Sequence, residues 1–461
     1  MKTKQIFTVL TVLSTLLFAS NGRAAETIIT ATGSGNWSST VTNAPWPDGI
    51  VPATNNAVAV YAPNNITVDS TATIAYIVGS GTVTMAPGAT LNILGSANGG
   101  EGTQDLVGLL DTSATGNTVI YSGNWFWAKH QNYYNLVFNN STTNIYDFYN
   151  GPSSGSDVAM TIFGDMTVIG KGKVQEGNDF TIGGNLIIGT NSTWDCSSFN
   201  LTVTSNTTVT GLLIDLDGAL GLDNFLGNVT INKSNLGWNL TDVTQWSVGG
   251  SLTNNGTIIG IGYGSIAFNG TGNIAGSAIK IPTMTINGTY AIGTTITLTT
   301  NTPTLNGTLV FDLAKTNQIV LKAGTNWLFY SGILNVINSG APPVLGNSYK
   351  FFNATNYGGA FASTSFPSLP SGLIWVDNLL SSGSIAVGGS AGRPIITLSS
   401  SGGLLTLSWD STTFPGYRVQ AQTNSAGIGT NWSSTGSGTN SPFTIPINPA
   451  NPAVFFRLSN P

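Results

Sequence analysis

The segment from residue 161 to residue 168 reads TIFGDMTV, and the segment from residue 181 to residue 188 reads TIGGNLII. Each pairs two short, alternately apolar strands around a turn that contains glycine. The two segments start 20 residues apart, a period typical of a parallel β-helix with two or three short strands per coil. Residues 201–209 continue the pattern loosely, and it returns at residues 246–252.

The same pattern extends outward from this echo over most of the chain. Short apolar strands separated by Gly or Asn turns recur from Trp37 to about Tyr290, and no segment keeps apolar residues at helical spacing over three turns. The sequence therefore predicts an all-β fold, a right-handed parallel β-helix followed by a small C-terminal β-sandwich-like domain.

Changes in composition and in the regularity of the strand pattern divide the chain into five expected parts. Residues 1–24 are a signal peptide, 25–285 the parallel β-helix and 286–388 a less regular β-rich continuation. Residues 389–392 have the composition of a flexible linker. Residues 393–461 alternate apolar and polar positions between closely spaced turns, which favours the β-sandwich-like module.

Charge and targeting signals predict an exported protein. Asp, Glu, Lys and Arg make up 7% of the chain, against roughly 25% in an ordinary soluble domain. Lys2 and Lys4 precede an apolar run over residues 6–18 that is too short for a permanent membrane span. Cleavage after Ala24 keeps 11 basic residues against 19 acidic ones, a net charge of −8, which disfavours nucleic acid as a partner. We expect a secreted or outer-surface bacterial protein with no transmembrane segment after signal removal.

Parts of the sequence resemble known families of exported proteins. Residues 325–387 resemble the end of autotransporter-associated β-strand repeat proteins, through the stretches YKFFNA (349–354), YGGAF (357–361), LPSGLIW (369–375) and GSIAV (383–387). Residues 34–37 with 46–52 are similar to the entry segment of bacterial surface β-helices. The tail, with LSW (407–409) and FFRL (455–458), resembles a C-terminal module of diverse exported bacterial proteins. The resemblance implies a secreted or surface-displayed β-solenoid and a tail used for attachment or sorting.

The densest aromatic stretch, WFWAKHQNYY over residues 125–134, is the candidate ligand site. Trp125 and Trp127 would share one face of a strand, with Tyr133 and Tyr134 close by, and exposed flat rings stack on sugar rings. The alternative is that these side chains fill a widened coil. His130, the one histidine, is expected to be a polar surface residue.

Asp215 and Asp217, followed by Asp223, come closest to a carboxylate pair. On a strand the first two would point to one face about 7 Å apart. That separation suits glycosidase chemistry or a Ca²⁺ site, and the alternative is a pair of solvated residues at a coil edge. Cys196, the only cysteine, is expected to be a small buried hydrophobe.

No set of residues predicts a catalytic site. Residues 25–392 contain no arginine, whereas a lyase needs a basic residue and a partner that neutralises charge. The sequence therefore favours a structural or adhesive role in contact with polysaccharide or the cell envelope. A carbohydrate-active hydrolase or lyase of β-helix type is the alternative, and the oligomeric state stays open.

Overall fold

The computed structural model describes residues 27–459, apart from 96–107, 123–125, 141–144, 150–158, 176, 198, 216–220, 233–236, 241–244, 261–263, 323–326, 390–393, 426, 437–439 and 452. The chain divides into two compact units. The first comprises residues 1–339, 350–365 and 379–383, and the second comprises residues 340–349, 366–378 and 384–461.

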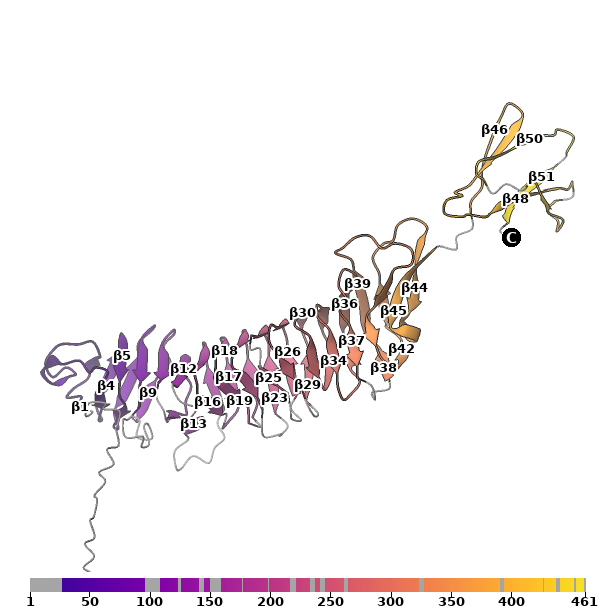
Figure 1. Cartoon of the computed structure of the whole chain (residues 1–461). Coiled ribbons are helices and arrows are strands. Elements are labelled where there is room, and N and C mark those ends of the chain that lie inside the picture. Colours follow the sequence, from indigo (N-terminus) through magenta and orange to yellow (C-terminus); the bar gives the residue numbers. More distant parts are fainter. Residues whose placement is uncertain are drawn as a thin grey trace, which may run out of the picture. The chain divides into compact units, whose positions relative to one another are not determined.

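The first unit is a parallel β-helix, so the predicted fold class is confirmed (Figure 1). Sheet 1 has fourteen parallel strands: β5 (Thr71–Ile74), β8 (Thr90–Ile93), β10 (Thr118–Tyr121), β12 (Asn135–Asn140), β15 (Met166–Gly170), β18 (Leu186–Ile188), β21 (Thr207–Val209), β24 (Val229–Ile231), β27 (Leu252–Asn254), β30 (Thr271–Gly276), β33 (Thr289–Ile292), β36 (Thr308–Asp312), β39 (Ile333–Ile337) and β43 (Ser363–Ser365).

Two further parallel sheets complete the coils. Sheet 2 has eleven strands: β11 (Phe126–Lys129), β13 (Ile145–Tyr149), β16 (Lys173–Gln175), β19 (Thr193–Asp195), β22 (Leu212–Ile214), β25 (Trp238–Asn239), β28 (Ile258–Ile259), β31 (Ile279–Ile281), β34 (Ile296–Leu298), β37 (Ile319–Leu321) and β41 (Phe352–Asn353). Sheet 3 has eight: β14 (Met160–Ile162), β17 (Phe180–Ile182), β20 (Leu201–Val203), β23 (Leu222–Phe225), β26 (Gln245–Val248), β29 (Ser265–Phe268), β32 (Thr283–Ile286) and β35 (Thr304–Leu305).

Shorter elements lie at both ends of this unit. Before β14 they are β1 (Thr27–Thr30), β3 (Asn56–Ala59) and β6 (Ile77–Val78) in one sheet, β2 (Gly35–Asn36), β4 (Asn65–Val68), β7 (Thr82–Met85) and β9 (Leu109–Asp111) in another, and the 3₁₀ turn Pro47–Gly49. Towards the other end β38 (Trp327–Tyr330) pairs in parallel with β42 (Asn356–Gly359), and α1 spans Leu379–Ser382.

The strand register confirms the 20-residue echo of the sequence. Thr161 pairs with Thr181 between β14 and β17, and Met166 pairs with Leu186 between β15 and β18. Each full coil adds one strand to sheets 3, 1 and 2 in chain order. Sheet 1 also runs through residue 286 without a break, from β30 into β33 and β36.

Inward-facing apolar side chains fill the coils, because alternate residues of a strand point to opposite faces. The β15 pattern is representative: Met166 and Val168 are fully buried, and Thr167 between them is half-buried. Larger rings fill the interior of the later coils, where Phe225 stacks on Trp246 and both contact Trp238. Burial of each such side chain contributes about 1.5–3 kcal/mol to folding.

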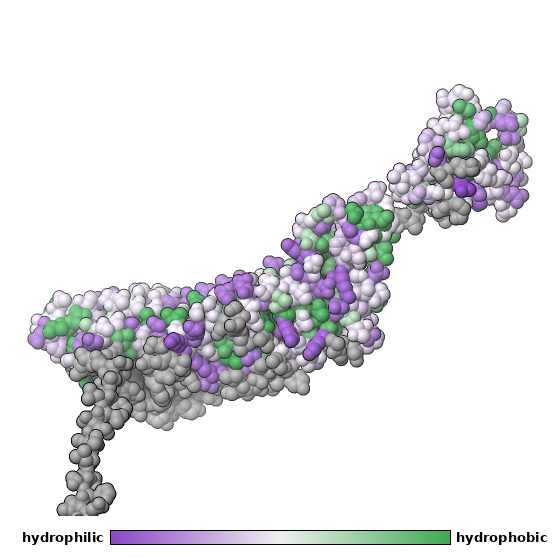
Figure 2. Space-filling view, in the orientation of Figure 1, coloured by the Kyte–Doolittle hydropathy of each residue, from purple (hydrophilic) through white to green (hydrophobic). Residues whose placement is uncertain are grey.

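Side-chain ladders of one Asp and several Asn residues connect neighbouring coils at the turn that enters sheet 1. The Asp165 Oδ1 accepts from the Asn185 backbone N–H at 2.7 Å, and the Asn185 Oδ1 accepts from the Asn206 N–H at 3.2 Å. The Asn206 Oδ1 then accepts from the Asn228 N–H, and the Asn228 Oδ1 from the Ser251 N–H. These bonds satisfy backbone groups that the turns leave unpaired. The pale, weakly polar surface in Figure 2 agrees with the low charge of the chain.

The second unit consists of antiparallel sheets. One contains β40 (Ser348–Lys350), β45 (Ser384–Gly389) and β44 (Leu373–Asn378). Two three-stranded sheets follow, made of β46 (Thr397–Ser401), β47 (Leu404–Ser408) and β50 (Phe443–Pro446), and of β49 (Ser433–Ser434), β48 (Arg418–Thr423) and β51 (Val454–Ser459). Leu407, Trp409 and Val419 form a small apolar core that includes both of these sheets. This arrangement is the predicted sandwich-like domain.

Candidate functional site

Only some side chains of the predicted aromatic stretch are described, so the exposed pair of Trp125 and Trp127 stays a prediction. Trp125 lies outside the described residues, and Trp127 belongs to β11, where its backbone pairs with Asp147. Tyr133 is fully buried and offers no ring to a surface ligand, whereas Tyr134 is half-buried. For Tyr133, therefore, the prediction of a sugar platform is wrong, and the alternative of a filled coil describes its position.

The hydroxyl group of the buried Tyr133 has partners inside the coil. It donates to the Lys129 carbonyl oxygen at 2.6 Å and lies 2.9 Å from the Tyr121 hydroxyl. Burial raises the pKa of both phenols because it disfavours the charged form. The Tyr121 ring also lies 5.8 Å from the Phe138 ring. These three rings are part of the core.

An exposed aromatic pair lies on β38, at Trp327 and Phe329. The strand reads WLFY, so residues 327 and 329 share its outer face while Leu328 and Tyr330 point inward. Trp327 is 46% exposed and Phe329 is 54% exposed. Their ring centroids are 5.7 Å apart, and their planes differ by 11°. The two rings are thus nearly parallel and accessible to solvent.

The neighbouring strand β42 leaves room for these rings. Gly358 pairs with Phe329 in the register, and a Cβ added at residue 358 would lie 3.0 Å from the Phe329 ring and 3.5 Å from the Trp327 ring. A Cβ there would press on the Phe329 ring and contact the Trp327 ring. Asn356 pairs with Trp327, which places an amide-bearing residue next to the indole-bearing one.

The inner face of β38 anchors the pair to the core. The Tyr330 hydroxyl donates to the Leu379 carbonyl oxygen at 2.9 Å, and its ring stacks on the Phe361 ring at 4.8 Å. Leu328 is fully buried. A strand held by buried residues on one face presents the residues of its other face in a defined geometry. This exposed aromatic pair is the candidate binding site.

The sequence contained a signal for this pair. WLFY alternates in the same way as the segment around Trp125 and Trp127, and it lies at the start of the stretch that carries the family resemblance. Which face of such a strand is buried depends on its contacts with the rest of the fold, here the pairing with β42 and the contacts of Tyr330. Neither contact can be read from the letters of one strand.

The predicted carboxylate pair has a different arrangement. β22 ends at Ile214, and Asp215 lies in the following turn with 2% exposure, while Asp217 falls outside the described residues. Asp223 is fully buried on β23. Burial raises the pKa of Asp223 to about 8, and the nearby charge of Asp215 adds to the increase. The prediction that Asp215 lies on a strand and shares a face with Asp217 is thus wrong, because Asp215 follows the end of β22 and lies near Asp223.

Hydrogen bonds hold the Asp223 carboxyl group in the interior. Its Oδ1 accepts from the Leu201 backbone N–H at 3.0 Å, and the Cys196 thiol is a second partner. Cys196 is fully buried, as predicted. A carboxyl group without solvent contact cannot reach a polysaccharide, so the Asp215 and Asp223 carboxyl groups are not placed for glycoside hydrolysis.

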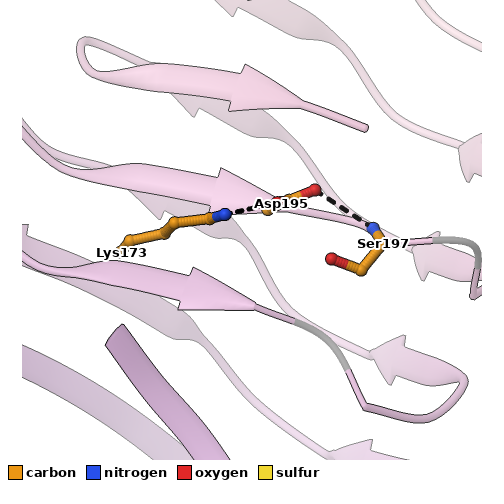
Figure 3. A network of polar contacts seen from close by, with 3 residues as sticks. All are labelled: Lys173, Asp195 and Ser197. Carbon is orange, nitrogen blue, oxygen red and sulfur yellow. Dashed lines mark hydrogen bonds and ion pairs between the residues drawn. The ribbon is translucent and has the colours of Figure 1, made fainter. Parts of the chain in front are cut away.

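A buried ion pair lies one coil earlier (Figure 3). The Lys173 Nζ is 2.6 Å from the Asp195 Oδ2, and the Ser197 backbone N–H donates to the Asp195 Oδ1 at 3.2 Å. Asp195 is fully buried, whereas the Lys173 side chain is 25% exposed. The lysine therefore compensates a carboxylate that is otherwise removed from water.

Within the part of the chain that the structure describes, no group of three or more His, Cys, Asp or Glu side chains is arranged to hold a metal ion. The Ca²⁺ site at Asp215 and Asp217 stays a prediction, since Asp217 is not described. The His130 Nε2 lies 3.2 Å from the Asn178 amide nitrogen. No helix among the described residues is long and apolar enough to cross a membrane.

Comparisons with protein-family models, with curated proteins and with solved structures found no match to this chain. The resemblance to autotransporter-associated repeat proteins stays a prediction.

Proposed function

We propose that this chain is a secreted or surface-displayed bacterial β-solenoid with a structural and adhesive role, and that it contacts polysaccharide. The observation that carries the proposal is sheet 1, whose fourteen parallel strands continue from coil to coil. Each added coil extends the lateral faces with little change in the fold. A protein built this way can present the same kind of surface repeatedly to a polymer or a neighbouring cell.

The chemistry of the coils supports this role. Asn side chains make the hydrogen bonds between coils at the turns entering sheet 1, and neutral bonds are not screened by salt as surface ion pairs are. The stacking of coils is therefore suited to variable ionic strength outside a cell. The charge of −8 after signal removal favours neutral partners over polyanions.

The structure favours adhesion over the enzymatic alternative. A retaining or inverting glycosidase needs two carboxyl groups that contact the scissile bond, and Asp215 and Asp223 are both buried. The exposed aromatic pair, in contrast, is suited to contact without chemistry.

A test compares cells that produce the full-length chain with cells that do not. We expect surface proteolysis to remove the protein from intact producing cells, and these cells to adhere to polysaccharide-coated plates more than the control cells. Reducing-end and unsaturated-product assays on the same plates should show no cleavage. Equal adhesion of both cell types would overturn the adhesive role, and release of sugar products would favour the enzyme.

A further inference from the structure

We propose that Trp327 and Phe329 form a binding site for a neutral polysaccharide. This inference rests on the proposed adhesive function and names the residues that make the contact. The chain exposes two large rings side by side on one strand, with planes within 11° of each other. Exposed rings are enriched where they contact a partner, and the apolar faces of pyranose rings stack on aromatic faces.

The lack of charged residues in β38 and β42 favours a neutral ligand. None of the eight residues in β38 and β42 is Asp, Glu, Lys or Arg. These two strands therefore offer neither a cation for uronate or sulfate groups nor a carboxylate for an amino sugar. The net negative charge of the chain also repels polyanions. Asn356, paired with Trp327, is positioned to bond to sugar hydroxyls next to the stacked ring.

A purely structural role for the rings is the competing explanation. Both rings lie over Gly358, and aromatic side chains can shield a strand glycine from solvent. This role requires packing against the backbone but no ligand. The two explanations predict different consequences for binding and for stability.

The experiment measures binding of the mature full chain to insoluble and immobilised polysaccharides, neutral and anionic. The variants are Trp327→Ala, Phe329→Ala and Trp327→Phe. The matched control is Phe163→Ala, which removes a ring that is also 54% exposed but lies on another coil. Thermal unfolding of every variant checks the fold, and sedimentation checks self-association.

We expect wild-type protein to bind at least one neutral polysaccharide and no anionic one. Trp327→Ala and Phe329→Ala should weaken binding roughly tenfold, equal to about 1.4 kcal/mol, with unfolding midpoints close to that of the wild type. Trp327→Phe should keep most of the affinity, and Phe163→Ala should keep all of it.

Different outcomes separate the failure of this site from the failure of the adhesive function. Wild-type binding that Trp327→Ala and Phe329→Ala both preserve would overturn the site and leave adhesion standing. Equal weakening by Phe163→Ala, selective binding of anionic polysaccharides, or loss of a dimer in Trp327→Ala would also overturn the site. Absence of wild-type binding to every polysaccharide would overturn both proposals.

Discussion

The buried carboxyl group of Asp223 makes the stability of the coils depend on pH. Its pKa is about 8 in the folded chain against 3.8 for an ordinary Asp, so between these values the folded chain holds a proton that the unfolded chain has released. The free energy of unfolding therefore falls as the pH rises from about 4 to about 8. Below this window the contribution is fully present, and above it the loss is complete.

The expected size follows from the shift. Each pH unit within the window costs about 1.4 kcal/mol, so the full loss is on the order of 5 kcal/mol. Asp223→Asn should remove this dependence, because its Oδ1 can still accept from the Leu201 N–H and the amide carries no titrating proton. Asp215→Asn should reduce the dependence, since the Asp215 charge contributes to the raised pKa.

The assay is urea unfolding of wild type and both variants at pH 5, 6, 7 and 8. Subtracting the Asp223→Asn curve from the wild-type curve cancels the contributions of groups that titrate in both proteins. We expect the difference to change steadily over the window, with Asn stabilising the chain relative to Asp at pH 8. A difference that stays constant from pH 5 to pH 8 would refute the reasoning, because Asp223 would then titrate alike in the folded and unfolded states.

Three further substitutions test other parts of the fold. Asn206→Ala removes the acceptor of two hydrogen bonds from Asn228 and should lower the urea-unfolding free energy by about 1 kcal/mol, and no loss would exclude a stabilising ladder. Lys173→Met removes the ion-pair partner of the buried Asp195 carboxylate and should lower the free energy of unfolding by about 2 kcal/mol. This loss is below the usual value for a fully buried pair because Lys173 is partly exposed. Adding Asp195→Asn should restore part of the loss, and additive losses would contradict the pairing. Gly288→Ala drives a Cβ into the Gly270 carbonyl oxygen of the previous coil and should lower the melting temperature by several degrees, which an unchanged melting temperature would disprove.

The coil repeat could be predicted from the sequence because it depends on local alternation. Residues 161–168 and 181–188 encode the strands, the turn and the spacing in their own letters, and the register of β14 with β17 follows directly. The Asn ladders between coils also follow from composition. The side-chain amide of Asn can accept a hydrogen bond from one neighbouring coil and donate one to the other. These features need no knowledge of distant contacts.

The candidate sites could not be predicted as well, because they depend on where strands end and on what covers them. A strand through residues 215 and 217 predicts one shared face for Asp215 and Asp217, but β22 ends at Ile214 and Asp215 is buried after it. The letters of the aromatic stretch leave both an exposed platform and a filled coil open for Tyr133, whose hydroxyl lies 2.9 Å from the Tyr121 hydroxyl inside the coil. In both cases the deciding contact comes from another strand or another coil.

Burial has opposite effects on stability for the exposed aromatic pair and for the buried Asp223 carboxyl group. Asp223 is a polar group placed where burial costs stability, and its hydrogen bonds to Leu201 and Cys196 offset only part of that cost. Trp327 and Phe329 are apolar groups left where further burial would add stability. A ligand can supply that missing burial on β38, whereas the fully buried Asp223 is not accessible to a ligand. We therefore expect ligand recognition at Trp327 and Phe329, and we expect the burial of Asp223 to limit the stability of the fold.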